Sequence, residues 1–129
     1  MSARAAVMQG RRMAESLMVD RWEIFSLDPD DVDPLTGEAA RVTVYEGKGK
    51  LTSYEGYESN PESVGHTATI QRMSLHIPVG PYRPLVGHVA VCVESFDPNL
   101  VGTEYRVTQD APFKSLATAY RAFVDFKAA

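Results

Sequence analysis

The first residues of the chain place small and apolar side chains at the spacing of one helical face. They recur at every third or fourth position: Ala3, Ala6, Val7, Gly10, Met13, Ala14, Leu17 and Met18. This spacing predicts an amphipathic α-helix over residues 1–19, with Ser2 as its N-cap. Gly10 costs a helix about 1 kcal/mol relative to alanine, so we expect a close helix contact or a kink there. The apolar stripe can pack on the chain's own core or dock on a neighbouring subunit.

After residue 19 the spacing of apolar residues changes from that of a helix to every second residue. Short alternating segments, typical of β-strands, follow at regular spacing: 21–27, 41–45, 67–78, 88–94, 104–108 and 120–126. The glycine-rich residues 46–50 predict a bend, at a bulge or barrel corner, after which 51–53 continue extended. No strand–helix–strand alternation is present. We therefore predict a mainly β fold: a small antiparallel β-barrel or sandwich of about six strands, with an N-terminal α-helix and a long inter-strand loop. A short helix over 115–123 competes with the last strand.

Two segments without periodicity are predicted to be loops. Residues 28–40 contain two prolines, four aspartates and a Thr-Gly turn, and residues 54–66 contain two glycines, one proline and three glutamates. With 129 residues the chain is expected to form a single domain over 1–129, comprising the helix (1–19) and a β-barrel (20–129).

Composition excludes several classes of protein. The single cysteine, Cys92, excludes an intrachain disulfide framework and a cysteine-based zinc site. No apolar run approaches the 18 or so residues that span a bilayer. The first residues have neither the continuous apolar core nor the cleavage site of a secretory signal. We expect a chain that is made in the cytoplasm and has no membrane partner.

Charge is unevenly distributed along the chain, whose formal net charge is −4. Residues 1–19 carry three arginines and one glutamate, residues 20–38 carry seven acids and one arginine, and residues 39–129 carry nine charges of each sign. A general nucleic-acid binder needs a basic face. The pattern instead favours contacts with other protein surfaces.

The residues that could carry chemistry do not form a catalytic or metal-binding motif. His76 and His88 could lie on adjacent strands, but no histidine pair has a metal-ligand spacing. Cys92 lies in an alternating segment beside valines and is expected to be a small buried apolar residue. Gly47 to Lys50 lack the full phosphate-loop pattern.

The acidic residues also form no catalytic or metal-binding motif. Most lie in segments with few apolar neighbours, whereas general acid–base catalysis needs a carboxyl group in apolar surroundings. Pro29 and Pro34 interrupt the spacing of a calcium loop in 28–38. We expect no enzyme activity, no cofactor and no metal.

Several short motifs follow one another between residues 5 and 126. They are Gly10–Met18, Asp33–Glu38, Tyr45–Leu51, His76–Pro78, Val86–Val89 and Asp97–Val107. In their order and spacing they resemble the head-to-tail connector, or stopper, proteins of the neck of long-tailed actinobacterial phages.

The resemblance implies a structural protein of the virion neck, assembled in the host cytoplasm. Its small β-barrel would form a ring around the DNA channel. The implied partners are further copies of the chain in a cyclic homo-oligomer, a portal or head-tail adaptor protein, a tail terminator or tail protein, and double-stranded DNA that passes without sequence-specific binding.

In related stoppers a long loop between two strands points into the channel, and residues 54–66 occupy the matching place. The channel-loop candidates are Tyr54, Glu55, Tyr57, Glu58, Asn60, Glu62 and His66. A loop of about 12 residues can project about 20 Å. With three glutamates and no lysine or arginine, such a loop would repel DNA phosphates and limit sticking. A solvated surface loop is the alternative.

The charge pattern also predicts how copies of the chain meet. In a heterologous ring each subunit presents two different surfaces to its neighbours, and a basic helix beside an acidic segment could steer that contact. The subunit-interface candidates are Arg4, Val7, Arg11, Arg12, Met13, Leu17, Asp28, Asp30, Asp31 and Asp33.

Two other functions fit a small barrel of this size. One is a tail-completion or terminator protein. The other is a β-barrel ligand- or nucleic-acid-binding module, for which Tyr45, Lys48, Lys50 and Tyr54 are the nearest set of basic and aromatic residues.

Overall fold

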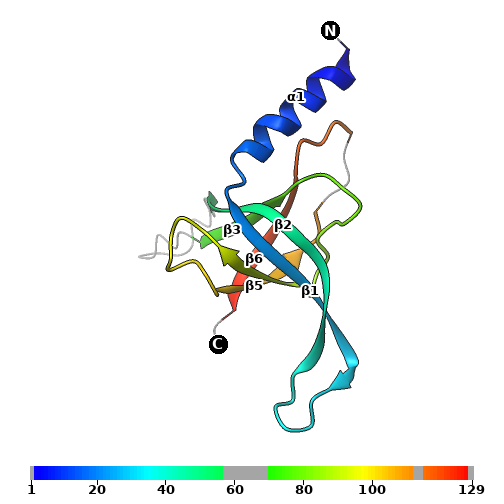
Figure 1. Ribbon diagram of the computed structural model, residues 1–129, viewed down its shortest axis with the longest axis vertical. Helices are drawn as coiled ribbons and strands as arrows, with labels where there is room; N and C mark the ends of the chain where they lie inside the picture. The colour runs from blue at the N-terminus through cyan, green and yellow to red at the C-terminus, as the bar shows by residue number, and fades with distance from the viewer. Residues whose placement is uncertain (1, 57–69, 112–114, 128–129) are drawn as a thin grey trace, which may run out of the picture.

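The computed structural model describes residues 2–56, 70–111 and 115–127, which form one α-helix and six β-strands (Figure 1). In chain order they are α1 (Ala3–Ser16), β1 (Asp20–Val32), β2 (Ala39–Gly56), β3 (Ile70–Ile77), β4 (Val89–Glu94), β5 (Glu104–Gln109) and β6 (Tyr120–Lys127). The predicted mainly β fold with an N-terminal helix is confirmed.

The six strands close into an antiparallel barrel in the order β1-β2-β3-β6-β5-β4. β1 pairs with β2 on one side and with β4 on the other, which closes the ring. β6 lies between β3 and β5.

Residues 120–127 form the strand β6 and not the competing helix over 115–123. In β6, Ala122 and Val124 point into the barrel and are each 1% exposed, while Arg121 and Asp125 are exposed. A period of two suits a strand with one buried face. Burial against β3 and β5 therefore decides between the two readings that the local pattern allowed.

The core fills the barrel interior with side chains from every strand except β2, which contributes partly buried residues. Its fully buried members include Trp22, Ile24, Leu75, Val107 and Val124. The Trp22 and Tyr105 rings pack 5.8 Å apart between centroids. Such burial supplies most of the driving force for folding.

Cys92 is part of this core, as predicted. Its side chain is 1% exposed, and burial raises the pKa of its thiol to about 11. A thiol held neutral in this way behaves as a small apolar group.

The glycines of β2 let this strand pass close over the core. An added Cβ at Gly49 would lie 2.8 Å from Trp22 Cδ1 and 3.1 Å from the carbonyl oxygen of His76. β2 is one continuous strand of 18 residues, and the predicted bend falls where it passes from pairing with β1, up to Gly49, to pairing with β3, from Lys50. Gly49 also allows the strand to approach the core closely.

Candidate functional site

α1 projects from one end of the barrel as a helical arm (Figure 1). The Ser2 hydroxyl accepts a hydrogen bond from Ala5 N at 3.1 Å, which confirms the predicted N-cap. The helix ends at Ser16 rather than at residue 19, and none of its residues is buried. Of the predicted apolar stripe, only Met18, just after the helix, is buried in the core; Val7, Gly10 and Ala14 are half-buried, and Met13 and Leu17 are exposed.

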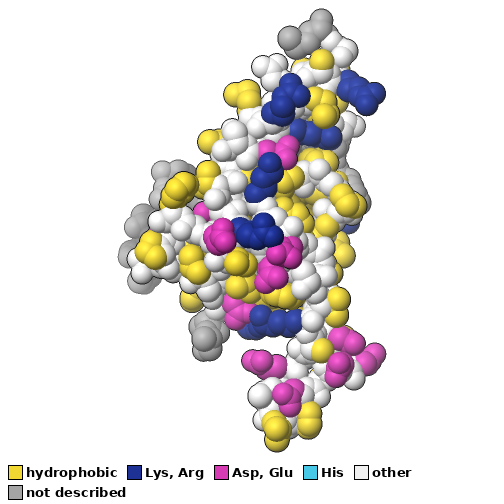
Figure 2. Space-filling model, viewed as in Figure 1, with side chains coloured by type: hydrophobic (Ala, Val, Ile, Leu, Met, Phe, Trp, Pro, Cys, Tyr) yellow, Lys and Arg dark blue, Asp and Glu magenta, His cyan; other side chains and the backbone are white. Residues whose placement is uncertain are grey.

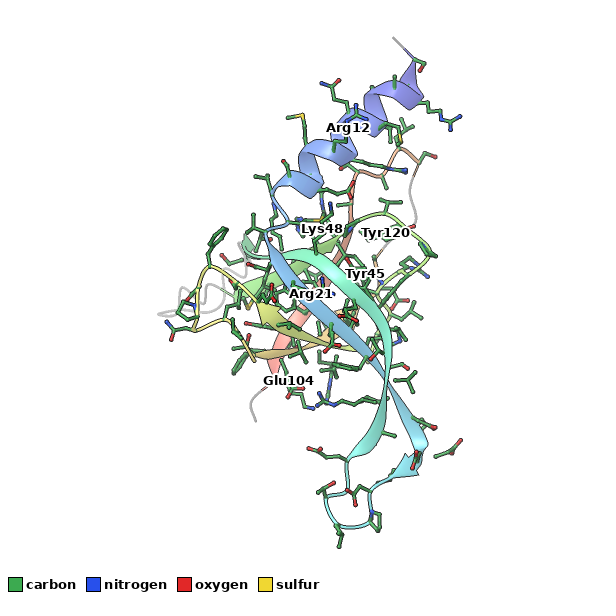
Figure 3. The ribbon with its side chains drawn as sticks, viewed as in Figure 1. Arg12, Arg21, Tyr45, Lys48, Glu104 and Tyr120 are labelled. Atoms are coloured by element: carbon green, nitrogen blue, oxygen red, sulfur yellow. The ribbon has the colours of Figure 1, made fainter. Side chains whose placement is uncertain are left out.

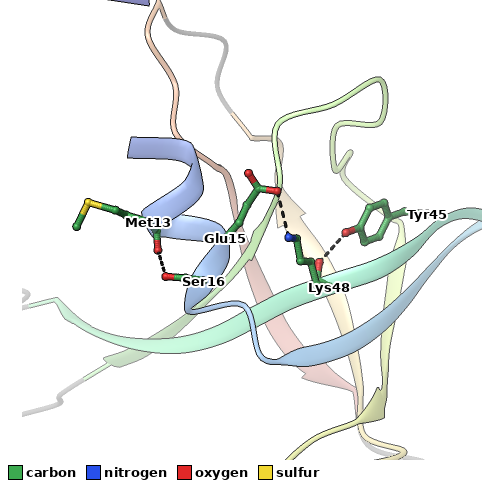
Figure 4. Close-up of polar contacts among 5 residues, drawn as sticks. All are labelled: Met13, Glu15, Ser16, Tyr45 and Lys48. Carbon is green, nitrogen blue, oxygen red and sulfur yellow. Dashed lines mark hydrogen bonds and ion pairs between the residues drawn. The ribbon is translucent and has the colours of Figure 1, made fainter. Parts of the chain in front are cut away.

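Polar contacts hold the second half of α1 against the barrel. Arg11 Nε donates a hydrogen bond to Ala117 O at 3.0 Å, and Glu15 forms an ion pair with Lys48 at 3.3 Å (Figure 4). Lys48 in turn accepts a hydrogen bond from the Tyr45 hydroxyl at its carbonyl oxygen. These polar contacts fix the direction of the helix without burying its side chains.

Gly10 marks the close contact that the sequence predicted. An added Cβ there would lie 2.9 Å from Thr118 Cγ2, in the connection between β5 and β6. Leu116 in the same connection has φ +61, in the left-handed region that non-glycine residues rarely adopt. The strained connection thus presents Ala117 and Thr118 to the helix.

Residues 28–40 form a β-hairpin, so the predicted loop is wrong for 28–32 and 39–40, which are strand, and is confined to the turn at 33–38. β1 continues to Val32 and β2 begins at Ala39, and these two residues pair. The register shifts between Asp28 and Val32, where Pro29 cannot donate a ladder hydrogen bond. We call residues 28–40 the acidic hairpin; it projects from the end of the barrel opposite α1 (Figure 1).

Local hydrogen bonds order the tip of the acidic hairpin. Asp33 N donates to Glu38 O and Gly37 N donates to Asp33 O, both at 2.8 Å. The Asp33 carboxylate accepts from Leu35 N at 2.9 Å, and Gly37 has φ +72, which glycine adopts without strain. This turn presents Leu35 to solvent with 93% of its side chain exposed.

Arg41 ties the base of the acidic hairpin to the barrel. Its guanidinium forms an ion pair with Glu104 of β5 and lies 5.6 Å from the centroid of the Phe25 ring. Figure 3 places Glu104 at the end of the barrel away from Arg12 of α1. The hairpin is therefore a braced extension of β1 and β2.

The two arms carry opposite charge. The five acids of the hairpin are Asp28, Asp30, Asp31, Asp33 and Glu38, and it contains no lysine or arginine. Figure 2 shows basic side chains over the α1 end of the molecule and acidic side chains over the hairpin. Within the described part of the chain, none of these acids forms an ion pair.

The predicted interface residues divide between the arms. Arg4, Arg12, Met13 and Leu17 are exposed, whereas Val7 and Arg11 are half-buried. Asp28 accepts a hydrogen bond from Asp30 N at 2.9 Å, while Asp31 and Asp33 lie exposed near the tip. The fold gathers each set on its own arm and separates the two sets by the length of the barrel.

Leu35 is an exposed residue that the interface prediction did not include. Its signal was present, since one leucine stands among proline, threonine and glycine in a turn. Ala117 and Thr118 were missed because nothing local indicates that they contact a helix more than a hundred residues earlier in the chain.

The predicted channel loop is only partly within the described residues. Tyr54 and Glu55 belong to β2, where they pair with Arg72 and Gln71 of β3. The start of the loop at residue 54 is thus wrong, because the ladder continues to Gly56. The other channel-loop candidates lie outside the described residues: Tyr57, Glu58, Asn60, Glu62 and His66.

His76 and His88 occupy separate environments. Burial, with the charges of Lys50 and Arg121, lowers the pKa of His76 to about 4. His88 Nδ1 lies 2.7 Å from the Tyr82 hydroxyl, and burial lowers the pKa of His88 and raises that of Tyr82. Both histidines are thus held mainly neutral at pH 7.

The described residues contain neither a cluster suited to a metal ion nor a helix suited to a membrane. Residues 2–56, 70–111 and 115–127 contain no group of three histidine, cysteine or carboxylate side chains placed to hold a metal ion. No helix in the same ranges has the length and apolarity needed to cross a membrane.

Comparison with known proteins identifies one family. A family model described as a family of unknown function, DUF6093, matches residues 10–125. No curated protein and no solved structure matches the chain.

Proposed function

The chain belongs to DUF6093, a family of unknown function, and we propose that it is a structural protein of the bacteriophage virion neck. In this proposal it forms a ring between the portal or head-tail adaptor and the tail, and the ring lines the channel through which double-stranded DNA passes. The motif order that resembles the stopper proteins supports this assignment.

One structural observation carries the proposal: a closed barrel bears two arms of opposite charge at opposite ends. Because the barrel strands pair on both sides, association through a free barrel edge is disfavoured, and the two arms project beyond the barrel as surfaces for protein contacts. Two unlike contact surfaces build a ring by head-to-tail association where the rotation between copies closes.

The overall charge also fits a channel wall better than a DNA-binding site. The net charge of −4 disfavours general retention of DNA, since non-specific binding depends on many lysine and arginine contacts with phosphates. DNA would pass such a ring without being retained by it.

Electron microscopy of virions from a phage that encodes this chain tests the proposal. We expect the chain as a ring at the head-tail junction, and we expect particles that lack it to accumulate as heads without attached tails. Its absence from the junction would overturn the proposal. A position at the tail end of the neck would favour the tail-terminator function instead, and tight, salt-sensitive binding of free DNA would favour a nucleic-acid-binding module.

A further inference from the structure

We propose that the tip of the acidic hairpin of one copy binds the exposed face of α1 on a second copy of the chain. This inference deepens the proposed function, on which its biological setting rests, by naming the two surfaces that meet. It concerns contact between copies and can be tested on the purified chain.

The first support is that both surfaces present large apolar side chains to solvent. On α1 and its C-cap, Met13 and Leu17 are 65% and 60% exposed and lie four residues apart, on one face of the helix. At the hairpin tip, Leu35 is 93% exposed and Val32 is 46% exposed. A contact between them would remove apolar surface of both from water.

The second support is charge complementarity around these apolar residues. Arg12 is adjacent to Met13, whereas Arg4 lies at the start of the helix and on the opposite face from Met13; both are exposed, and within the described residues neither forms an ion pair. Leu35 is flanked in the hairpin by Asp31, Asp33 and Glu38. The acid of α1, Glu15, is paired with Lys48, so α1 has a net positive charge and the hairpin a negative one, and the two apolar surfaces lie on arms of opposite net charge.

The third support is geometric, and it selects a second copy as the partner. The arms point away from opposite ends of the barrel, so they cannot meet within one chain (Figure 1). The surface that complements each arm is nevertheless present on every copy. A contact of this kind is heterologous, leaves one arm free at each end, and repeats until the assembly closes.

The tip is also preorganised for binding. Its turn is closed by the Asp33–Glu38 and Gly37–Asp33 backbone hydrogen bonds, both at 2.8 Å. Ordering that is complete before association reduces the entropy lost on binding. The tip is therefore suited to bind α1 of the next copy as a rigid unit.

Charge reversal in two separate chains tests the contact. One variant carries Arg4→Glu and Arg12→Glu, so both of its arms are acidic; the other carries Asp30→Arg, Asp31→Arg and Glu38→Arg, which changes the net charge of its hairpin from −5 to +1, so both of its arms are basic. None of these three acids uses its carboxylate in the hydrogen bonds of the turn. The exposed β6 residues provide matched controls, Arg121→Glu and Asp125→Arg.

Sedimentation equilibrium at low ionic strength, at concentrations up to about 1 mM, measures association. We expect the unmodified chain to associate and each reversed variant to associate at least about tenfold more weakly, because like charges now meet. An equimolar mixture of the two variants should recover association, and the controls should behave as the unmodified chain does. Circular dichroism confirms that each variant is folded.

A second measurement uses cysteine cross-linking, since the native Cys92 is buried. A chain carrying both Leu35→Cys and Met13→Cys should form a ladder of disulfide-linked multimers on oxidation, whereas either single variant should stop at dimers. The inference is overturned if the unmodified chain stays monomeric throughout the concentration range, if the mixture does not recover association, or if the double-cysteine chain forms no ladder.

These outcomes separate the inference from the proposed function. Head-to-tail association by a chain that is missing from the virion neck would leave the inference standing and remove the function. A ring in the neck whose assembly is indifferent to both reversals would do the opposite.

Discussion

The barrel and the two arms are stabilised in different ways. In the barrel, Trp22, Ile24, Leu75 and Val124 are almost fully buried, and each strand pairs on both sides. In the arms no residue of α1 is buried, and every residue of the hairpin from 29 to 38 is exposed. The arms are ordered by caps, turns and a few polar contacts. Residues can therefore change in the arms for contact with partners while the barrel retains the stability of the fold.

Removing the largest core side chain should have the greatest effect on stability. Trp22 is 0% exposed and packs against Tyr105, so Trp22→Ala leaves a large cavity. We expect the free energy of unfolding to fall by about 3–5 kcal/mol, measured by urea denaturation. A loss below about 1 kcal/mol would show that the barrel does not depend on this core and would break the contrast with the arms.

A methyl group added where β2 crosses the core should have the next largest effect. The Cβ of Gly49→Ala meets Trp22 Cδ1 at 2.8 Å and a backbone oxygen at 3.1 Å. We expect a loss of about 1–3 kcal/mol in the same denaturation experiment, because the backbone or the indole must shift. Gly80→Ala is the matched control: nothing lies within 4 Å of its added Cβ, so stability should not fall. Equal losses in both variants would refute the close-approach role of Gly49.

Acid should weaken the barrel through His76. The unfolded chain binds a proton at this histidine near pH 6.5, whereas in the folded chain its pKa is about 4. The unfolded state therefore binds more protons between these values, and stability falls as the pH decreases from about 6.5 to 4. We expect this group to account for about 1 kcal/mol of the loss, since its half-exposed side chain is screened by solvent. The loss should be smaller in His76→Gln, compared by urea denaturation at pH 7 and pH 4.5, and identical pH dependence in the two proteins would contradict it.

A substitution at the tip of the acidic hairpin should have the smallest effect on folding. Leu35 is 93% exposed and its side chain packs on nothing in the barrel. We expect Leu35→Ser to change the free energy of unfolding by less than about 0.5 kcal/mol. Thermal unfolding, followed by circular dichroism, provides the measurement. A decrease comparable to that of Gly49→Ala would mean that the tip contributes to the fold and is not an independent arm.

Much of the barrel was predictable because one face of each strand is buried. The alternation in 120–126 follows from the buried inner face of Ala122 and Val124, and the N-cap Ser2 and the contact at Gly10 are local signals. Such patterns occur wherever one side of a strand or helix is buried and the other is exposed.

The acidic hairpin and the course of β2 could not be predicted, because neither has a local sequence pattern that identifies it. From Pro29 to Glu38 both faces of the ribbon are exposed, so no alternation of apolar residues distinguishes it from a loop. Gly47 and Gly49 indicate a bend in the sequence, but only the tertiary structure shows that Gly49 lies against Trp22. The anchoring of α1 depends on Ala117 and Thr118, which tertiary structure alone brings to it.

The position of β6 between β3 and β5 has a consequence for how the protein is made. β6 is the last of the six strands to leave the ribosome, yet it lies between two strands that are made before it. Until it arrives, the nascent chain has unpaired edges on β3 and β5, which can pair with the same edges of other nascent chains. The pairing of β3 with β6 and of β1 with β4 also joins segments distant in sequence, which slows folding. A cell that makes this protein in quantity would therefore depend on chaperones that cover the edges of β3 and β5 until β6 has inserted.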